Sequence, residues 1–426
     1  MAKIRPFLAY RFSEKAGDLE NLVAPPYDVI SPEERERLAA KSPYNTVWLT
    51  LPESLPDDRS KFVKYARSSS RLTEWKREGI LKAEEKPGLY LYLQTFTDPL
   101  TNRRLTRQSL ITLMKLEPYE KGIVLPHEET FPKHKEDRLR LLEATRTHLE
   151  CIYGLYQDEE MNVEKNLYSA PFETVAVVTT EDEIHHELKR CTDPDAIERI
   201  QKAMQPERVW IADGHHRYET ALNYRAQMGE RSEEIAEDYI LIALSSMRDP
   251  GLVILPTHRM IKHIEVSRNE ARQRLQTYFN VRDVAMNELP EEVRAHNAPD
   301  TRVFGVAMQD PVAWLATLEE PEAVLEWIEG DASDTWKMLD VTIAHELILK
   351  RVFGVKDTEG IAYTRSAEEA LESVRKKLYE VAILMNPPSV QTMRIIAEGG
   401  EKMPQKSTYY YPKLLSGLVF WSLENF

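Results

Sequence analysis

Residues 208–227 read RVWIADGHHRYETALNYRAQ, and this stretch decides the fold that we expect. Its apolar start predicts a short strand, Asp213 and Gly214 predict a turn, and the following residues predict a helix. A glycine in such a turn lets the backbone approach a ligand closely. The N–H groups that open the helix attract anions, and Arg217 adds a charged fork. This strand–turn–helix therefore indicates a phosphate-binding site.

Two other interpretations of the same turn stay open. The first is a polar surface turn with exposed histidines. The second is a zinc site built on His215 and His216, although no third ligand stands at a usual spacing from them. In the phosphate-binding interpretation, Asp213 binds a metal ion such as Mg²⁺ or orients a hydroxyl group.

Length, charge and composition exclude several classes of protein. The 426 residues suggest two or three domains. The net charge of −14 disfavours a surface that coats nucleic acid. No apolar run reaches the roughly 18 residues of a membrane span, and the start of the chain has no apolar run of signal-peptide length. Two cysteines exclude a disulfide scaffold and a four-cysteine zinc site. We therefore expect a cytoplasmic protein that acts on small molecules, with its oligomeric state open.

The order of predicted elements favours an α+β protein in three parts. We expect an N-terminal α+β subdomain over residues 1–120, a central part over 121–265 and a C-terminal α/β subdomain over 266–426. The strands that we predict are two hairpins (88–96 with 107–119, and 301–310 with 312–319), two adjacent buried strands (238–244 and 251–256) and one further strand (381–385). We predict one helix that begins at Pro132 and three further helices over residues 339–354, 366–380 and 389–400.

Three further segments carry chemistry. His127 and Glu128 lie in a proline-limited loop, where the carboxylate suits a general base; the alternative is a solvated acidic loop. Lys406, Ser407 and Thr408 combine a cation with two hydroxyls, which suits phosphate binding, although an exposed loop is equally ordinary. His258 and Arg259 end an apolar stretch, and we interpret them as structural; the alternative is that they line the ligand cleft.

Together these segments resemble a known family. VAPPYDVIS (23–31), HEET (127–130) with DRL (137–139), ADGHHRYETAL (212–222), DPGLVILPTHR (249–259) and MPQKSTYYYPKLLSGL (403–418), in this order, look like domain-of-unknown-function family 1015. That family resembles the ParB/sulfiredoxin-like superfamily, which includes the free-serine kinases. The resemblance implies a ParB/sulfiredoxin-like core around 121–265, with segment 400–413 returning to the site.

The resemblance also implies roles for individual residues. In the kinases, the glutamate of a similar HE pair acts as the base, and a DGHHR turn holds the phosphates. Carried over, Glu128 takes the proton, Asp213 contacts Mg²⁺ or the hydroxyl, and the rest of the site binds phosphate or substrate: His127, Gly214, His215, His216, Arg217, Lys406, Ser407 and Thr408. The three motifs are spaced more widely here, and Ser407 replaces the first threonine of the kinases' Lys-Thr-Thr segment.

These expectations combine into a kinase-like phosphotransferase of serine metabolism. The donor is a nucleotide or pyrophosphate, and the acceptor is the hydroxyl of serine or a similar small hydroxy acid. No Walker-type sequence is present, so an ordinary P-loop kinase is excluded. His215 stands where sulfiredoxin chemistry needs a cysteine, so that activity is not expected. Two rivals stay open: a phosphoserine-type phosphatase in the same pocket, and a non-catalytic nucleotide-binding regulator.

Overall fold

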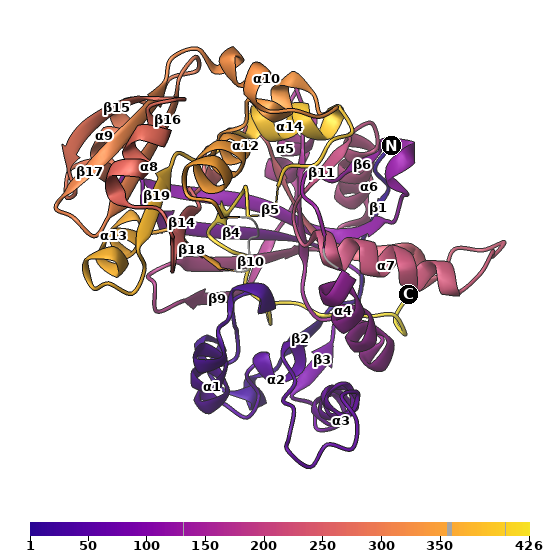
Figure 1. The fold of residues 1–426 in the computed structure, drawn as a ribbon. Coiled ribbons are helices and arrows are strands. Elements are labelled where there is room, and N and C mark those ends of the chain that lie inside the picture. Colours follow the sequence, from indigo (N-terminus) through magenta and orange to yellow (C-terminus); the bar gives the residue numbers. More distant parts are fainter. Residues whose placement is uncertain (131, 356–359, 405) are drawn as a thin grey trace. The chain divides into compact units, whose positions relative to one another are not determined.

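The computed structural model describes residues 1–130, 132–355, 360–404 and 406–426. These residues form two compact units (Figure 1). Unit 1 comprises Met1–Val253 together with Pro412–Phe426, and unit 2 comprises Ile254–Tyr411. Both units combine helices with sheets, which confirms the α+β class. Within the described ranges, no helix is both long and apolar enough to cross a membrane.

Unit 1 is built on a mixed nine-stranded sheet. Eight of its strands follow the order β6-β11-β8-β12-β5-β4-β10-β9, and β1 pairs with β5 as well. Most neighbours are antiparallel, but β12 runs parallel to β8 and β11 runs parallel to β6. The strands are β1 (Ile4–Arg5), β4 (Leu89–Thr97), β5 (Arg104–Lys115), β6 (Val124–Leu125), β8 (Ile152–Tyr156), β9 (Glu173–Thr179), β10 (His185–Cys191), β11 (Val209–Asp213) and β12 (Tyr239–Ser246).

Helices and two small ladders complete unit 1. The side chains of β8, β11 and β12 share an apolar core with α5, α6 and α7, which fixes the central strands beneath the candidate site. Helices α4 and α7 pack on each other (Figure 1). The ladders pair β2 (Tyr10–Phe12) with β3 (Leu81–Ala83) and β7 (Thr147–His148) with β21 (Trp421–Ser422). The helices are α1 (Pro32–Lys41), α2 (Val47–Thr50), α3 (Val63–Arg77), α4 (Pro132–Thr145), α5 (Asn162–Ser169), α6 (Pro194–Met204) and α7 (His215–Gln227).

Unit 2 is built on an antiparallel sheet of six strands in the order β15-β17-β16-β19-β14-β18. Helices α9 and α13 pack their apolar residues against it. Its strands are β14 (His258–Ile261), β15 (Asn280–Ala285), β16 (Arg302–Met308), β17 (Val312–Leu318), β18 (Ile361–Thr364), β19 (Val381–Met385) and the short β20 (Tyr410–Tyr411). Its helices are α8 (Arg268–Leu275), α9 (Leu289–Ala295), α10 (Val324–Trp327), α11 (Asp334–Lys337), α12 (Asp340–Ile343), α13 (Ala367–Arg375) and α14 (Val390–Glu398).

Most of the predicted elements are confirmed. Both hairpins form, as β4 with β5 and β16 with β17. The strand–turn–helix around Gly214 is present as β11 and α7, and helices begin at Pro132 and span parts of 366–380 and 389–400. The helix predicted over 339–354 also forms, but from Ala344 to Val352 it is wound as a π-helix.

The prediction of two adjacent buried strands is wrong. Tyr239–Ser246 lies in the nine-stranded sheet between β8 and β5. Val253–Ile254 (β13) is not part of that sheet. The physical reason is the DPG turn: a Cβ on Gly251 would lie 2.5 Å from the backbone of Thr106 and Arg107, so the chain there is pressed against β5. Apolar runs reveal burial, but they do not reveal which neighbour a strand takes.

The division into three parts at 1–120, 121–265 and 266–426 stays a prediction, as does the ParB/sulfiredoxin-like core. Segment 400–413 is divided between the two units, because Pro412 and Lys413 belong to unit 1 and the residues before them to unit 2. Gln405, in the same segment, lies outside the described residues.

Candidate functional site

The turn between β11 and α7 is made possible by Gly214. Its φ of 89° lies in the left-handed region, and a Cβ there would come within 2.8 Å of Ile152 Cγ2. Because glycine has no side chain, no side chain caps the first turn of α7 from this position. The N–H groups that open a helix carry a partial positive charge. The turn therefore has the backbone of an anion-binding site.

An ion pair links this turn to the end of the chain. Lys413 Nζ lies 2.5 Å from Asp213 Oδ2, and both side chains are largely buried. Burial by itself would raise the pKa of Asp213, but the charges of Lys413 and Arg217 outweigh it and hold that pKa well below its usual range. Asp213 is thus an anion between two cations.

Arg217 projects from the first turn of α7. Its Nη1 donates to the carbonyl of Cys151 at 2.6 Å. Its Nε is buried and has no hydrogen-bond partner among the described residues. Burial opposes the charge, but Glu150 and Asp213 outweigh it and raise the pKa of Arg217. A buried guanidinium N–H without a protein partner is costly unless an ordered water or a ligand oxygen accepts from it.

The histidines of the two motifs meet in unit 1. The rings of His127 and His215 are 4.7 Å apart, edge to face, and the His127 N–H donates to His215 Nε2 at 3.4 Å. His127 Nδ1 donates to the Ile211 carbonyl at 2.6 Å, which assigns its proton to Nδ1. Burial lowers the pKa of His127 to about 4, so its ring is neutral at pH 7.

These contacts join the HE pair to the DGHHR turn. Glu128 follows the anchored His127 and is partly exposed, whereas Glu129 is exposed. His216 is partly buried on α7 beside His215. The backbone of the loop is therefore fixed next to the turn at the position before Glu128.

Sequence reasoning missed three residues near Arg217, namely Tyr27, Arg138 and Glu150. Tyr27, in the VAPPYDVIS motif, donates its N–H to Glu150 Oε1 at 3.0 Å. The Arg138 guanidinium carbon lies 4.0 Å from the centre of the Tyr27 ring, and that of Arg217 lies 5.9 Å from it. Burial raises the pKa of Tyr27, so its hydroxyl stays protonated. The signal was present, since PPYD and DRL belong to motifs that carried the family resemblance.

Lys413 was also missed, because Lys406 was chosen for the two hydroxyls that follow it. The backbone of Lys413 is fixed by buried polar side chains of the sheet. Gln94 donates to the Lys413 carbonyl at 2.9 Å, and Arg107 donates to the Pro412 carbonyl. Ser416 pairs with Ala24 through two backbone hydrogen bonds and donates its hydroxyl to Glu150. The C-terminal motif thus lies against the N-terminal one.

The three predicted residues Lys406, Ser407 and Thr408 lie in unit 2. The Ser407 hydroxyl is buried and donates to the Pro404 carbonyl. The carbonyl of Lys406 accepts from Arg259 at 3.3 Å. Their role in holding phosphate stays a prediction.

A magnesium ion fits this site only if a phosphorylated ligand supplies most of its ligands. Among the described residues, no three His, Cys, Asp or Glu side chains come together as a metal cage. One oxygen of Asp213 is engaged by Lys413, which leaves the carboxylate as a single ligand at most. Mg²⁺ is commonly held by one or two carboxylates plus substrate phosphates. The residues present fit an ion that arrives with a phosphorylated ligand.

A family model matches most of the chain. The model "Protein of unknown function (DUF1015)" covers residues 4–342. The chain belongs to the DUF1015 family. The predicted family membership is thereby confirmed, and the matched range includes the PPYD, HE and DGHHR motifs. No curated protein sequence matches this DUF1015 chain with significance.

Solved structures show only a distant likeness. "Free serine kinase in complex with AMP" has 13% identity and a TM-score of 0.35, and the match covers 70% of this chain and 86% of that one. A conserved hypothetical protein from Pyrococcus furiosus has 12% identity and a TM-score of 0.35, covering 74% and 96%. SbnI with a C-terminal truncation, from Staphylococcus aureus, has 10% identity and a TM-score of 0.34, covering 72% and 85%. Such scores do not establish a common fold, so the function proposed next depends on this chain's own residues.

Proposed function

We propose that this DUF1015 protein is a phosphotransferase, which moves a phosphoryl group between a nucleotide or pyrophosphate donor and the hydroxyl of serine or a similar small hydroxy acid. We further propose that its phosphate site is built on a ParB/sulfiredoxin-like core. The observation that carries the proposal is the start of α7, where the left-handed Gly214 leaves the helix N-terminus without a side-chain cap and Arg217 stands in the first turn.

Charge around the turn supports an anionic ligand. Arg217 and Lys413 are two cations beside Asp213, Glu150 is a second anion beside Arg217, and both cations are held in place by neighbouring groups. Phosphoryl transfer depends mainly on positioning and on neutralising charge. In this proposal Lys413, Arg217 and the N–H groups of α7 hold the phosphates. A Mg²⁺ ion that arrives with the donor would supply further neutralisation.

Glu128 is the proposed base. The acceptor oxygen attacks phosphorus, the bond from phosphorus to the leaving oxygen breaks, and the hydroxyl proton passes to the Glu128 carboxylate. His127 is neutral and anchored to the Ile211 carbonyl, so we assign it a positioning role for Glu128. His215 and His216 open α7 and face the same ligand in this proposal, and Lys406, Ser407 and Thr408 remain candidates for binding the donor.

The test begins with ligand binding. Thermal shift with ATP, ADP, CTP, pyrophosphate and phosphoserine identifies the phosphorylated ligand, and calorimetry gives its affinity. We expect Arg217→Lys, which keeps the charge, to bind more weakly than wild type, and Arg217→Ala to lose about 1.5–3 kcal/mol of binding free energy. The control is Arg375→Ala, an exposed arginine of unit 2. Unchanged affinity of Arg217→Ala for every ligand would remove the anion site.

Turnover then separates the proposal from its rivals. Phosphorus NMR of the protein with serine and the best donor is expected to show a new phosphoserine signal. Release of phosphate from phosphoserine without a nucleotide would instead establish the phosphatase. Tight nucleotide binding with no phosphorus exchange in either direction would establish the regulator.

A further inference from the structure

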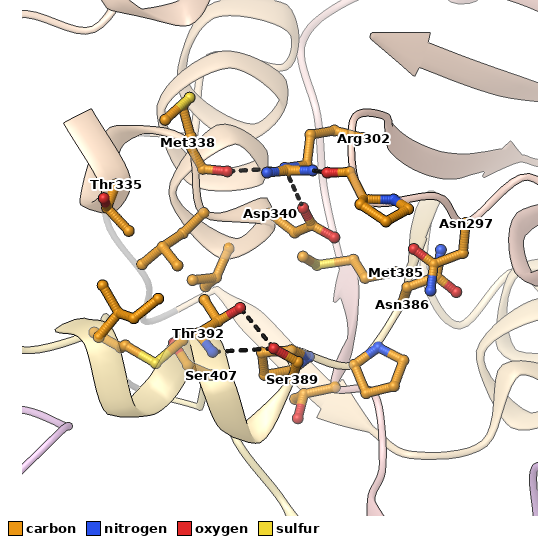
Figure 2. Close-up of a pocket in the computed structure, with 18 of the residues that line it drawn as sticks. Asn297, Arg302, Thr335, Met338, Asp340, Met385, Asn386, Ser389, Thr392 and Ser407 are labelled. Atoms are coloured by element: carbon orange, nitrogen blue, oxygen red, sulfur yellow. Dashed lines mark hydrogen bonds and ion pairs between the residues drawn. The ribbon is translucent and has the colours of Figure 1, made fainter. Parts of the chain in front are cut away.

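Unit 2 contains a cavity of 470 Å³, and Ser407 is the one residue of its lining that the proposed function also names. The volume is within the range of about 300–1,000 Å³ that is typical of small-molecule sites. Figure 2 shows the arrangement of its polar groups. Arg302 and Asp340 lie on one wall, Ser389 and Thr392 lie on the opposite wall, and Asn386 lies between them. All the residues that line the cavity belong to unit 2.

One wall is the N-terminus of α14, a helix of nine residues. Its N-cap, Ser389, accepts the Thr392 N–H at 3.0 Å, which satisfies only one of the N–H groups of the first turn. The remaining groups and the helix dipole favour an anion at this wall. A helix N-terminus alone does not establish a site, so a second observation is required.

Thr257 supplies that observation. It lines the cavity, is only 3% exposed, and its hydroxyl has no hydrogen-bond partner among the described residues. Leaving a buried hydroxyl unpaired costs free energy, and native proteins rarely do so without a ligand or water. Thr257 therefore contributes an unsatisfied polar group to the residues that line the cavity.

The opposite wall presents a carboxylate. Arg302 Nε lies 3.1 Å from Asp340 Oδ1 and also donates to the Met338 carbonyl at 2.9 Å, and its Nη1 donates to the Pro299 carbonyl. The guanidinium is thus shared among several acceptors. Burial raises the pKa of Asp340 to about 6, and Arg302 lowers it only in part.

The other residues of the lining indicate which ligand groups, besides charged ones, the cavity can hold. Asn386 donates its amide N–H to the Val293 carbonyl at 2.9 Å, so its own oxygen is directed away from that bond. Apolar and thioether side chains form another part of the surface, namely Met338, Leu339, Val341, Met385, Ile395 and Met403. Thioethers adapt to irregular apolar groups.

We propose that this cavity binds a free α-amino acid with an uncharged, apolar side chain. Its carboxylate lies at the N-terminus of α14, its ammonium group lies between Asp340 and the Asn386 carbonyl oxygen, and its side chain contacts the thioether wall. Thr257 donates its hydroxyl to the carboxylate. The proposal does not depend on phosphoryl transfer. It still holds if the protein binds such an amino acid but transfers no phosphate.

The probes are L-methionine and two analogues that each lack one charge. Calorimetry of the full chain is expected to show binding of L-methionine, and much weaker binding of both 4-(methylsulfanyl)butanoate, which lacks the ammonium, and 3-(methylsulfanyl)propylamine, which lacks the carboxylate. Asp340→Asn is expected to weaken L-methionine by about 10- to 100-fold, the usual range for a charge-assisted contact. The matched control is Asp300→Asn, an exposed carboxylate of the same unit.

Proton release gives a second, independent measurement. Near pH 6, Asp340 is about half protonated, and an ammonium group beside it favours the carboxylate, so binding releases protons to the buffer. Arg259 and Arg302 are the other charged side chains in the lining, and neither titrates at this pH. Calorimetry in buffers of different ionisation enthalpy measures this release for the wild type, whether or not Asp340→Asn folds.

Thr257→Val removes the unpaired hydroxyl and nearly preserves the shape. We expect it to fold and to weaken L-methionine. The proposal is overturned if no apolar amino acid binds at millimolar concentration, if Asp340→Asn and Thr257→Val bind as tightly as wild type, or if binding takes up protons. Binding of AMP in this cavity in place of L-methionine would also overturn it.

Discussion

Lys413 Nζ lies 2.5 Å from Asp213 Oδ2, although 200 residues separate them in the sequence. The contact places the C-terminal segment of unit 1 on the turn between β11 and α7. Buried donors from β4 and β5 hold the same segment through Gln94 and Arg107. The Asp213 carboxylate and the cation that balances it are therefore brought together by tertiary structure and not by any local motif.

Lys413→Met tests the energetic role of this pair. The substitution leaves a largely buried carboxylate with Arg217 as its remaining cation, and removing one partner of a buried pair costs about 3 kcal/mol. Denaturation followed by tryptophan fluorescence is expected to show that loss at pH 7. Lys376→Met, whose side chain is 63% exposed, is the control and is expected to be nearly neutral.

The same variant has a predictable pH dependence. Because the pKa of Asp213 is depressed in the folded protein, its contribution to stability is fully present above its unfolded value of about 3.9 and is lost as the pH falls through the folded value. The difference between wild type and Lys413→Met is thus expected to shrink below pH 4. A Lys413→Met variant as stable as wild type at pH 7 would contradict the pairing.

Gly214→Ala tests why glycine stands in the turn. The alanine Cβ would come within 2.8 Å of Ile152 Cγ2 and 3.1 Å of Arg217 Nη2, at a φ of 89°. Gly229→Ala is the matched control, because Gly229 also has a positive φ, 69°, but nothing lies within 4 Å of its added Cβ. Backbone strain alone costs about 1 kcal/mol or more, so we expect Gly229→Ala to lose about that much and Gly214→Ala clearly more. Equal losses in thermal unfolding would show that the close approach to Ile152 has no effect.

The sequence revealed local structure far better than it revealed the contacts between residues that are distant in the chain. The DGHHR turn was predicted correctly because its glycine, strand and helix are neighbours along the chain. The contact of His127 with His215 was not predicted, because the family resemblance assigned both residues to one site without naming a contact between them. Lys413, Tyr27 and Glu150 were not assigned roles, because their contacts depend on how the first 30 and the last 15 residues pack on the sheet.

The hydrophobic pattern also failed to predict the type of helix where this depends on backbone hydrogen bonding. Residues 339–354 have an amphipathic helical pattern, and nothing in it distinguishes the π-helix of Ala344–Val352 from an α-helix. Thr257 and Asp340 show no motif at all, and they attract attention only once the cavity of unit 2 is seen. A site of this kind is made of residues that are ordinary in sequence.

His127 is expected to remain neutral well into the acid range. Burial lowers its pKa in the folded protein to about 4, below the unfolded value of about 6.5. Its contribution to stability is therefore fully present above pH 6.5 and is lost as the pH falls toward 4. NMR titration of the His127 ring, assigned by comparison with His127→Gln, measures this directly. A midpoint near 6.5 would show that the ring is solvated and does not anchor the loop.

The last prediction concerns Glu128, which distinguishes a catalyst from a binding protein. Glu128→Gln keeps the volume and one acceptor oxygen but removes the base, and a general base typically contributes about 10²–10⁴ in rate. We expect turnover to fall by that factor while the affinity for the phosphorylated ligand is nearly unchanged, because the anion is held at Arg217 and Lys413. The neighbouring Glu129 is exposed and serves as the matched control, so Glu129→Gln is expected to have a mild effect. Initial rates and affinities measured on the same preparations separate the two roles. Full turnover of Glu128→Gln on an identified substrate would show that a group other than Glu128 takes the proton.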